Sequence, residues 1–152
     1  MTETPAPETA ASDTAAAETP APDLRRTPVR VVMSSTVVAV RGGSRLSEAV
    51  DTFVRTGLRH LVVVDATGRS AGILSQETVT TAWLAPASRH VSRVHEMVSH
   101  PDTSVHADTT VQEVAGLMRD SGLDAVPVVG HDGRLIGVVT RTDLVRLLAG
   151  GP

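Results

Sequence analysis

The sequence predicts an α+β fold in which one strand–helix–strand–strand–helix unit occurs twice, with the two copies packed through their sheets about a pseudo-twofold axis. Two observations lead to this prediction. The text TGLRHLVVVDATGRSAGILSQET, which starts at Thr56, returns as SGLDAVPVVGHDGRLIGVVTRTD from Ser121, 65 residues later. Short β-branched runs also alternate with helical patterns in both copies. One copy alone offers little apolar surface, so the two are expected to share a core.

Each copy opens with a short strand followed by a helix. The expected first strands are residues 37–40 (VVAV) and the stretch around Val105. Apolar residues then recur at three- and four-residue spacing, from Leu46 in the first copy and from Val111 in the second. This period predicts amphipathic helices with one face turned to the core.

Both helices carry terminal signals. Ser44 and Asp108 are the expected N-caps, because their side-chain oxygens can accept hydrogen bonds from the first free backbone N–H groups. Gly57 and Gly122 are expected to end the helices, since glycine adopts the left-handed conformation of a helix terminus without strain.

A hairpin and a second helix complete each copy. The runs LVVV and AVPVV are short and β-branched, and turns containing TG or DG separate them from AGIL and LIGVV. Two apolar runs joined by a glycine turn predict a β-hairpin. A second helix is expected to start near Ser75 in the first copy and near Thr140 in the second.

The composition divides the chain into five segments. Residues 1–28 contain Ala, Thr, Pro and Glu with almost nothing to bury, so they are expected to form a disordered acidic tail, and they lack the apolar core of a signal peptide. The expected order continues with the first copy at 29–84, a linker at 85–93, the second copy at 94–148 and a flexible C-terminus at 149–152.

Several function classes are disfavoured. From residue 29 onward 12 Arg balance 12 Asp or Glu, so no broad basic face for nucleic acid is expected, and one Phe and one Trp offer little to stack on bases. No apolar run is long enough to span a membrane, and the absence of Cys fits a cytoplasmic protein. The histidines lack metal-ligand spacing and no catalytic constellation is present, so we expect neither a metal site nor an enzyme.

The motifs around both hairpins resemble the CBS domain family. In the second copy 123–127 (LDAVP) and 137–143 (GVVTRTD) match the family pattern in full, whereas in the first copy Val62 replaces the proline and Thr78 replaces the final acid. The resemblance covers residues 29–148. Two such domains in tandem form a Bateman module, so the chain resembles a stand-alone CBS domain-containing protein.

Thr140 and Asp143 have two interpretations. A hydroxyl at the N-cap with an acid three residues later is a capping box, which needs no ligand. Alternatively, the carboxylate suits the vicinal diol of a ribose, and the hydroxyl with free N–H groups suits phosphate. The resemblance favours the second interpretation, and both stay open.

The resemblance also implies that each cleft is built from both copies. Arg59 would fork onto phosphate in the cleft closed by Asp143, and His60 would add charge when protonated. The alternative for Arg59 is an exposed charge beside Asp65 or Asp124. The implied ribose and phosphate residues are Thr140, Thr142, Asp143, Arg59 and His60, and the implied base pocket is Ser34, Ser35, Thr36, Val38 and Val138.

The other cleft is expected to be degenerate. It would combine Ser75 and Thr78 with Asp124, so it lacks the diol-accepting carboxylate and places an anion where the first cleft has Arg59. A phosphate there would meet like charge. We expect this cleft to be empty or to take an uncharged ligand.

Together these features predict a non-catalytic regulatory module. It would bind AMP, ADP, ATP or a related adenosyl ligand, require no cofactor, and signal to a partner protein that the sequence does not identify. A homodimer is expected, with Trp83 as a core or contact residue. The alternative is a purely structural protein–protein interaction module in which Thr140 and Asp143 only cap a helix.

Overall fold

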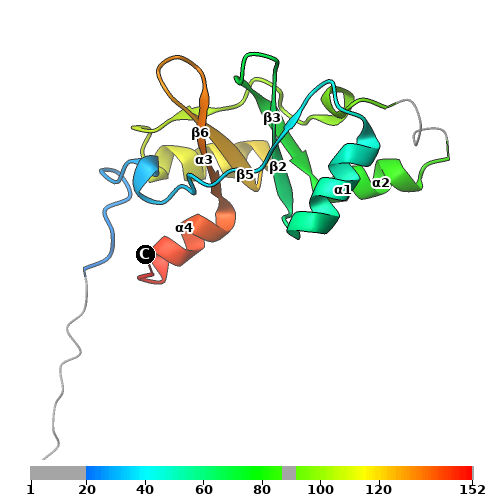
Figure 1. Ribbon diagram of the computed structural model, residues 1–152. Helices are drawn as coiled ribbons and strands as arrows, with labels where there is room; N and C mark the ends of the chain where they lie inside the picture. Colours follow the sequence, from blue (N-terminus) through cyan, green and yellow to red (C-terminus); the bar gives the residue numbers. More distant parts are fainter. Residues whose placement is uncertain (1–19, 87–91, 152) are drawn as a thin grey trace, which may run out of the picture.

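Two three-stranded sheets form the centre of the protein, one from each copy of the repeated unit (Figure 1). The computed structural model describes residues 20–86 and 92–151. The first sheet contains β1 (Ala39–Arg41), β2 (His60–Val64) and β3 (Ser70–Ser75), and the second contains β4 (Val105–His106), β5 (Ala125–Val129) and β6 (Leu135–Thr140). In each sheet the first two strands are parallel and the last two form an antiparallel hairpin. The predicted α+β fold class is confirmed.

Helices follow the strands in the predicted order. They are α1 (Leu46–Thr56), α2 (Gln76–Leu84), α3 (Val111–Ser121) and α4 (Arg141–Leu148), with short 3-10 helices η1 (Val29–Val31) and η2 (Val94–Met97). Within the described residues, no helix has the length and apolar character that a membrane crossing requires.

The helix ends agree with the prediction at the C-terminal side and differ at the N-terminal side. Gly57 and Gly122 end α1 and α3 with φ of 66° and 72°. The N-cap predictions are wrong, because Arg45 and not Ser44 occupies the N-cap position of α1, and Thr110 and not Asp108 caps α3. At α3 the reason is a capping box: the Thr110 N–H donates to the Glu113 carboxylate at 2.8 Å, and the Thr110 hydroxyl accepts from the Glu113 N–H at 3.2 Å.

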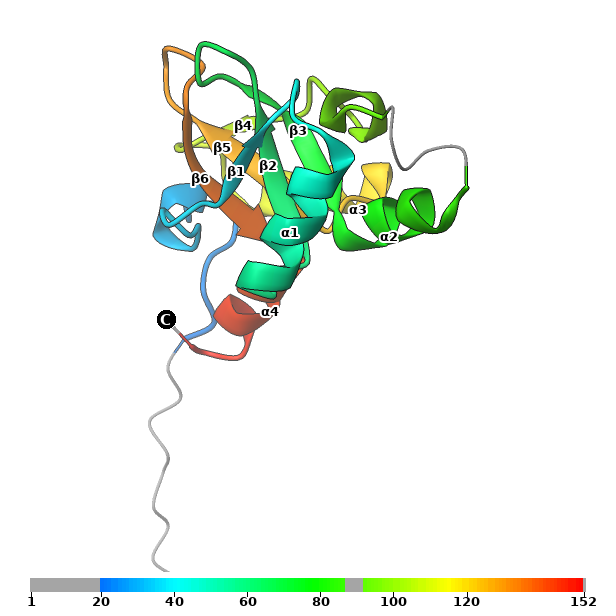
Figure 2. The ribbon, with the colours of Figure 1, turned by 45° about the vertical axis from the view of Figure 1, so that its right-hand side comes forward.

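The strands bury residues on both faces. On the outer face of the first sheet, Leu61 and Val63 pack with residues of α1 and α2, which lie side by side in Figure 2. On the inner face, Val62 and Ile73 pack against Ala125 of the second sheet. Successive side chains of a strand point to opposite faces, so β2 serves the helices and the other sheet at once. The predicted packing of the two copies through their sheets is confirmed.

The segment before each first strand packs on the opposite half of the molecule. Val29 of η1 is fully buried in the core of the second half, and its N–H donates to Thr109 O at 2.7 Å. Val94 of η2 is fully buried in the core of the first half in the same way. The two 3-10 helices thus each pack on the other half, as the pseudo-twofold relation requires. As a result, the chain after η1 runs along the second half.

The end of the predicted disordered tail, residues 23–28, is docked on the second half. Residues 1–19 lie outside the described residues, but the segment from Asp23 to residue 28 is bonded to the start of α3. The N–H groups of Val111 and Gln112 donate to Thr27 O at 2.8 Å and Leu24 O at 3.1 Å. Leu24 also packs against the core of the second half. Free N–H groups at a helix start need acceptors, and this segment supplies two of them.

The other predicted boundaries also changed slightly. Residues 87–91 of the predicted linker and residue 152 lie outside the described residues. Ser92 contacts the first half, since its carbonyl accepts from the Leu46 N–H at 3.2 Å. At the C-terminus, which we expected to be flexible, Gly150 and Gly151 close α4 through backbone hydrogen bonds to Leu147 and Arg146.

Candidate functional site

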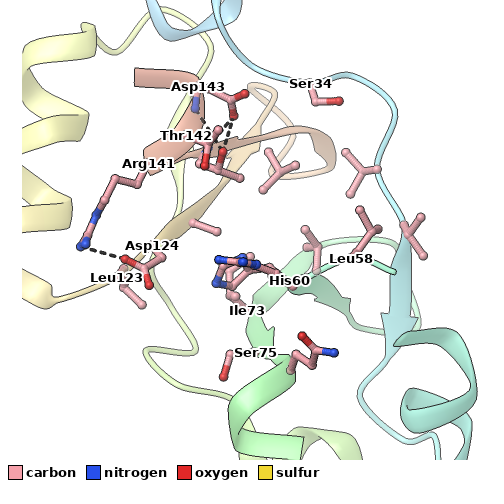
Figure 3. A pocket seen from close by; sticks show the side chains of 18 of the residues that line it. Ser34, Leu58, His60, Ile73, Ser75, Leu123, Asp124, Arg141, Thr142 and Asp143 are labelled. Carbon is pink, nitrogen blue, oxygen red and sulfur yellow. Dashed lines mark hydrogen bonds and ion pairs between the residues drawn. The ribbon is translucent and has the colours of Figure 1, made fainter. Parts of the chain in front are cut away.

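A cavity of about 1050 Å³ opens between the two halves, where β3 and β6 end and α2 and α4 begin (Figure 3). Residues of both halves line it, including the segments before β2 and β5. We expected two separate clefts. Residues of both expected clefts line this cavity, because the two sheets meet face to face and bring the corresponding ends of both hairpins together.

The start of α4 forms the capping box at one side of this cavity. Asp143 Oδ2 accepts from the Thr140 N–H at 2.7 Å and from the Thr140 hydroxyl at 2.8 Å. The other carboxylate oxygen, Oδ1, lies 3.8 Å from Arg146 Nη1. The capping interpretation of the motif is therefore realised, and it uses one carboxylate oxygen. Asp143 Oδ1 receives no hydrogen bond from the described residues, so it can still accept one from a ligand.

Arg59 and His60 face the same cavity from the start of β2, because the Gln76 N–H donates to Arg59 O at 2.9 Å and His60 pairs with Ser75. The alternative for Arg59 was an exposed charge beside Asp65 or Asp124; the side chain is exposed, and it forms no ion pair with either acid among the described residues. Arg59 is exposed, so its guanidinium is available to an anionic ligand.

Burial lowers the pKa of His60 below its usual value; the negative charge of Asp124 raises this pKa and the positive charge of Arg59 lowers it. Two opposite charges therefore act on this imidazole, one from each half of the molecule. A phosphate arriving beside His60 would favour its protonated form, as any nearby anion does.

Most residues of the predicted base pocket lie on the segment that follows η1 and runs along the second half. Ser34, Thr36, Val38 and Val138 line the cavity, and Ser35 does not. The backbones of Ser34 and Val138 exchange two hydrogen bonds of 2.9 and 3.0 Å. Gly137 permits this approach, because a Cβ there would lie 2.9 Å from Ser34 O. The glycine of the repeated motif thus places the chain after η1 at the cavity wall.

The predicted degenerate cleft is the other side of the same cavity. Ser75 lines it, but Thr78 does not, because the Thr78 and Ser75 hydroxyls bond to each other at 2.8 Å and cap α2. Asp124 lines the cavity as expected, but it is not an isolated anion. Its Oδ1 lies 2.8 Å from Arg141 Nη2.

Sequence reasoning missed four ionisable side chains here. Arg141, Glu77 and His100 line the cavity, and Arg146 lies next to Asp143. Arg141 could have been found, since it lies inside the TRTD motif between two predicted ligand residues. Within 20–86 and 92–151, no group of three or more His, Cys, Asp or Glu side chains is placed to hold a metal ion.

Both halves of the chain match the family model for the CBS domain, over residues 29–85 and 91–150. The chain therefore belongs to the CBS domain family and carries two copies of the domain, as the resemblance implied. The copies correspond to the two sheet-and-helix units described above.

Individual relatives share the pair of domains. The magnesium transporter MgtE of Thermus thermophilus is 34% identical over 122 residues, which are 77% of this chain and 26% of that protein. This chain thus spans about a quarter of that relative's length. The solved cytosolic domain of the Mg²⁺ channel MgtE in complex with ATP superposes with a TM-score of 0.64 at 34% identity, covering 76% of this chain and 46% of that one. The CBS domain pair of protein MJ0100, in complex with 5′-methylthioadenosine and S-adenosyl-L-methionine, gives a TM-score of 0.71 at 27% identity, with 82% and 97% covered.

Proposed function

We propose that this protein is a non-catalytic regulatory module that binds an adenosyl ligand in the cavity between its two CBS domains and signals occupancy to a partner protein. The single observation that carries the proposal is the composition of the cavity. It combines a carboxylate oxygen of Asp143 that receives no hydrogen bond from the described residues, the exposed guanidinium of Arg59 and the apolar side chains of Val38 and Val138.

These groups match the three parts of a nucleotide. Asp143 Oδ1 can accept a hydrogen bond from the ribose diol, with the Thr142 hydroxyl beside it. Val38 and Val138 offer apolar surface to the adenine base, and Arg59 with protonated His60 attracts phosphate. AMP, ADP, ATP and S-adenosylmethionine are the candidates to test, and no cofactor is required.

Two relatives support this ligand class. The MgtE cytosolic domain was solved with ATP, and the MJ0100 domain pair with two adenosyl compounds. The fold match extends over most of this chain in both cases. We transfer from them the class of ligand and not the activity of the whole proteins.

Signalling requires a surface that senses occupancy. A ligand shifts a partner only through its different affinity for two states. Exposed apolar side chains at the end of α1 and α2, Val54 (80% exposed) and Leu84 (66%), are a suitable contact for a second copy.

Trp83, which we expected at the core or at the contact, packs against the core of the first half. We propose a cytoplasmic homodimer that acts on an effector protein, and a monomer mass in light scattering at tens of micromolar would contradict the dimer.

A thermal-shift series with AMP, ADP, ATP, NAD and S-adenosylmethionine tests the binding proposal. A ligand present at a hundredfold its dissociation constant should stabilise the fold by about 2.7 kcal/mol. If no ligand raises the midpoint, the structural interaction module is the better account. The observation that favours it is the complete capping box, which explains Thr140 and Asp143 without a ligand.

A further inference from the structure

A second guanidinium faces the cavity, and a carboxylate holds it. Arg141, the first residue of α4, lies with its Nη2 2.8 Å from Asp124 Oδ1, and its backbone N–H donates to Asp124 O at 2.8 Å (Figure 3). Both side chains line the cavity. Arg141 also lies next to Thr142 and Asp143, which we assigned to the ligand.

This ion pair is easy to open. The side chains of Arg141 and Asp124 are 59% and 53% exposed, so water screens their attraction. Exposed pairs of this kind change an equilibrium by at most about 5-fold. A phosphate group offers the guanidinium the same two-oxygen geometry as a carboxylate with more negative charge. A bound phosphate can therefore replace Asp124 as the partner of Arg141.

The pseudo-twofold relation shows that the pair is specific to one half. The positions that correspond to Asp124 and Arg141 in the first copy are Arg59 and Gln76. Arg59 forms no ion pair among the described residues, whereas Arg141 is paired with Asp124. Both guanidinium groups belong to side chains that line the cavity. Asp124 also acts on His60, the third group able to carry positive charge beside them.

Resting on the proposed function, we infer that Arg141 is a second phosphate-binding residue and that Asp124 competes with the ligand for it. Asp124 then determines how strongly the cavity prefers phosphorylated adenosyl ligands over unphosphorylated ones. While the pair is closed, Arg59 is the guanidinium of the described cavity lining that is left to attract phosphate. When a phosphate takes Arg141, Asp124 is released to water at the exposed rim, where its solvation costs little.

Calorimetric titration of the full chain with ATP and with adenosine tests this inference. Asp124→Asn should tighten ATP by about 3- to 5-fold, the most that an exposed pair can withhold, and Arg141→Gln should weaken ATP by about 10-fold. In the Arg141→Gln background, Asp124→Asn should have less than about a third of its effect, counted in log units. Adenosine should change less than about 2-fold in every variant, because it carries no phosphate.

The chain supplies a matched control. Asp120 forms an exposed pair with Arg119 at the same 2.8 Å, and it does not line the cavity, so Asp120→Asn should leave ATP binding unchanged. Unchanged far-UV circular dichroism and thermal midpoints establish that the Asp124 and Arg141 variants fold, and Asp124→Ser provides a second neutral variant.

Two results would overturn the inference and leave the proposed function in place. One is ATP binding by the wild type that Asp124→Asn does not tighten. The other is an equal gain from Asp124→Asn with and without Arg141, since this would mean that Asp124 acts by simple repulsion. If the wild type binds S-adenosylmethionine but no phosphorylated ligand, the inference fails alone; if it binds none of AMP, ADP, ATP, NAD and S-adenosylmethionine, the proposed function fails as well.

Discussion

Replacing Asp143 by Asn separates the two roles of this side chain. In the protein, Oδ2 accepts two hydrogen bonds from Thr140, at 2.7 and 2.8 Å, and Oδ1 is left for the ligand. Asn has a single acceptor oxygen. It can preserve the capping box, in which case the amide NH₂ group faces the ribose, or it can serve the ribose and leave the cap broken.

The expected magnitudes follow from these contacts. If the amide oxygen stays on Thr140, losing a charge-assisted bond to the diol should weaken AMP by about 1–3 kcal/mol, or about 5- to 150-fold. If the oxygen turns to the ligand, the lost cap should destabilise the fold by about 0.5–2 kcal/mol. Calorimetry with AMP and thermal unfolding of the same sample measure both quantities.

Glu113→Gln is the matched control for this experiment. Thr110 and Glu113 form the same kind of capping box at α3, away from the cavity. This variant should lower the thermal midpoint and leave AMP binding unchanged. An Asp143→Asn protein that binds AMP as well as the wild type and melts at the same temperature would refute the reasoning, because the carboxylate would then have neither role.

Three further predictions concern other parts of the chain. Arg59→Ala should weaken AMP by about 1.5–3 kcal/mol and leave adenosine nearly unaffected in calorimetry, whereas equal losses for both ligands would give Arg59 a structural role. Deleting residues 1–22 should leave the thermal midpoint unchanged. Deleting residues 1–28 should lower it by several degrees, because Leu24 packing and two carbonyls that accept from the start of α3 are lost. Equal midpoints of the two deletion variants would contradict the docking of this segment. The pKa of His60 is lowered in the folded protein, so its contribution to stability is full above the unfolded pKa of about 6.5 and is lost as pH falls through the lower folded pKa. His60→Gln should therefore reduce the drop in the thermal midpoint between about pH 7.5 and pH 5. An unchanged drop would exclude His60 as its source.

The local elements were predictable because each has a signal of short range. Glycine at a helix end and glycine in a hairpin turn have few other uses, so Gly57 and Gly122 were placed correctly. The N-caps failed because Asp108 and Thr110 can both cap, and the reciprocal acid at Glu113 decides for Thr110. The glutamate at the corresponding position of α1, Glu48, accepts from the Arg45 N–H at 3.2 Å in the same way.

The arrangement around the cavity was harder to predict, because it depends on contacts between distant segments. The spacing of apolar residues in the sequence does not predict that η1 packs on the second half, or that Leu24 docks at α3. The family resemblance implied that Arg59 and Asp143 line the same cavity, and both residues do line it. It did not supply the pair between Asp124 and Arg141, which depends on the direction of two long exposed side chains.

The central claim is that the cavity binds one adenosyl ligand through Asp143, the third residue of α4. Titrating AMP into the full wild-type chain tests it most directly, since calorimetry gives both affinity and stoichiometry. The account predicts one site per chain, because Thr78 provides no carboxylate at the corresponding position of the first copy. Two sites of similar affinity, or no binding at any accessible concentration, would contradict it.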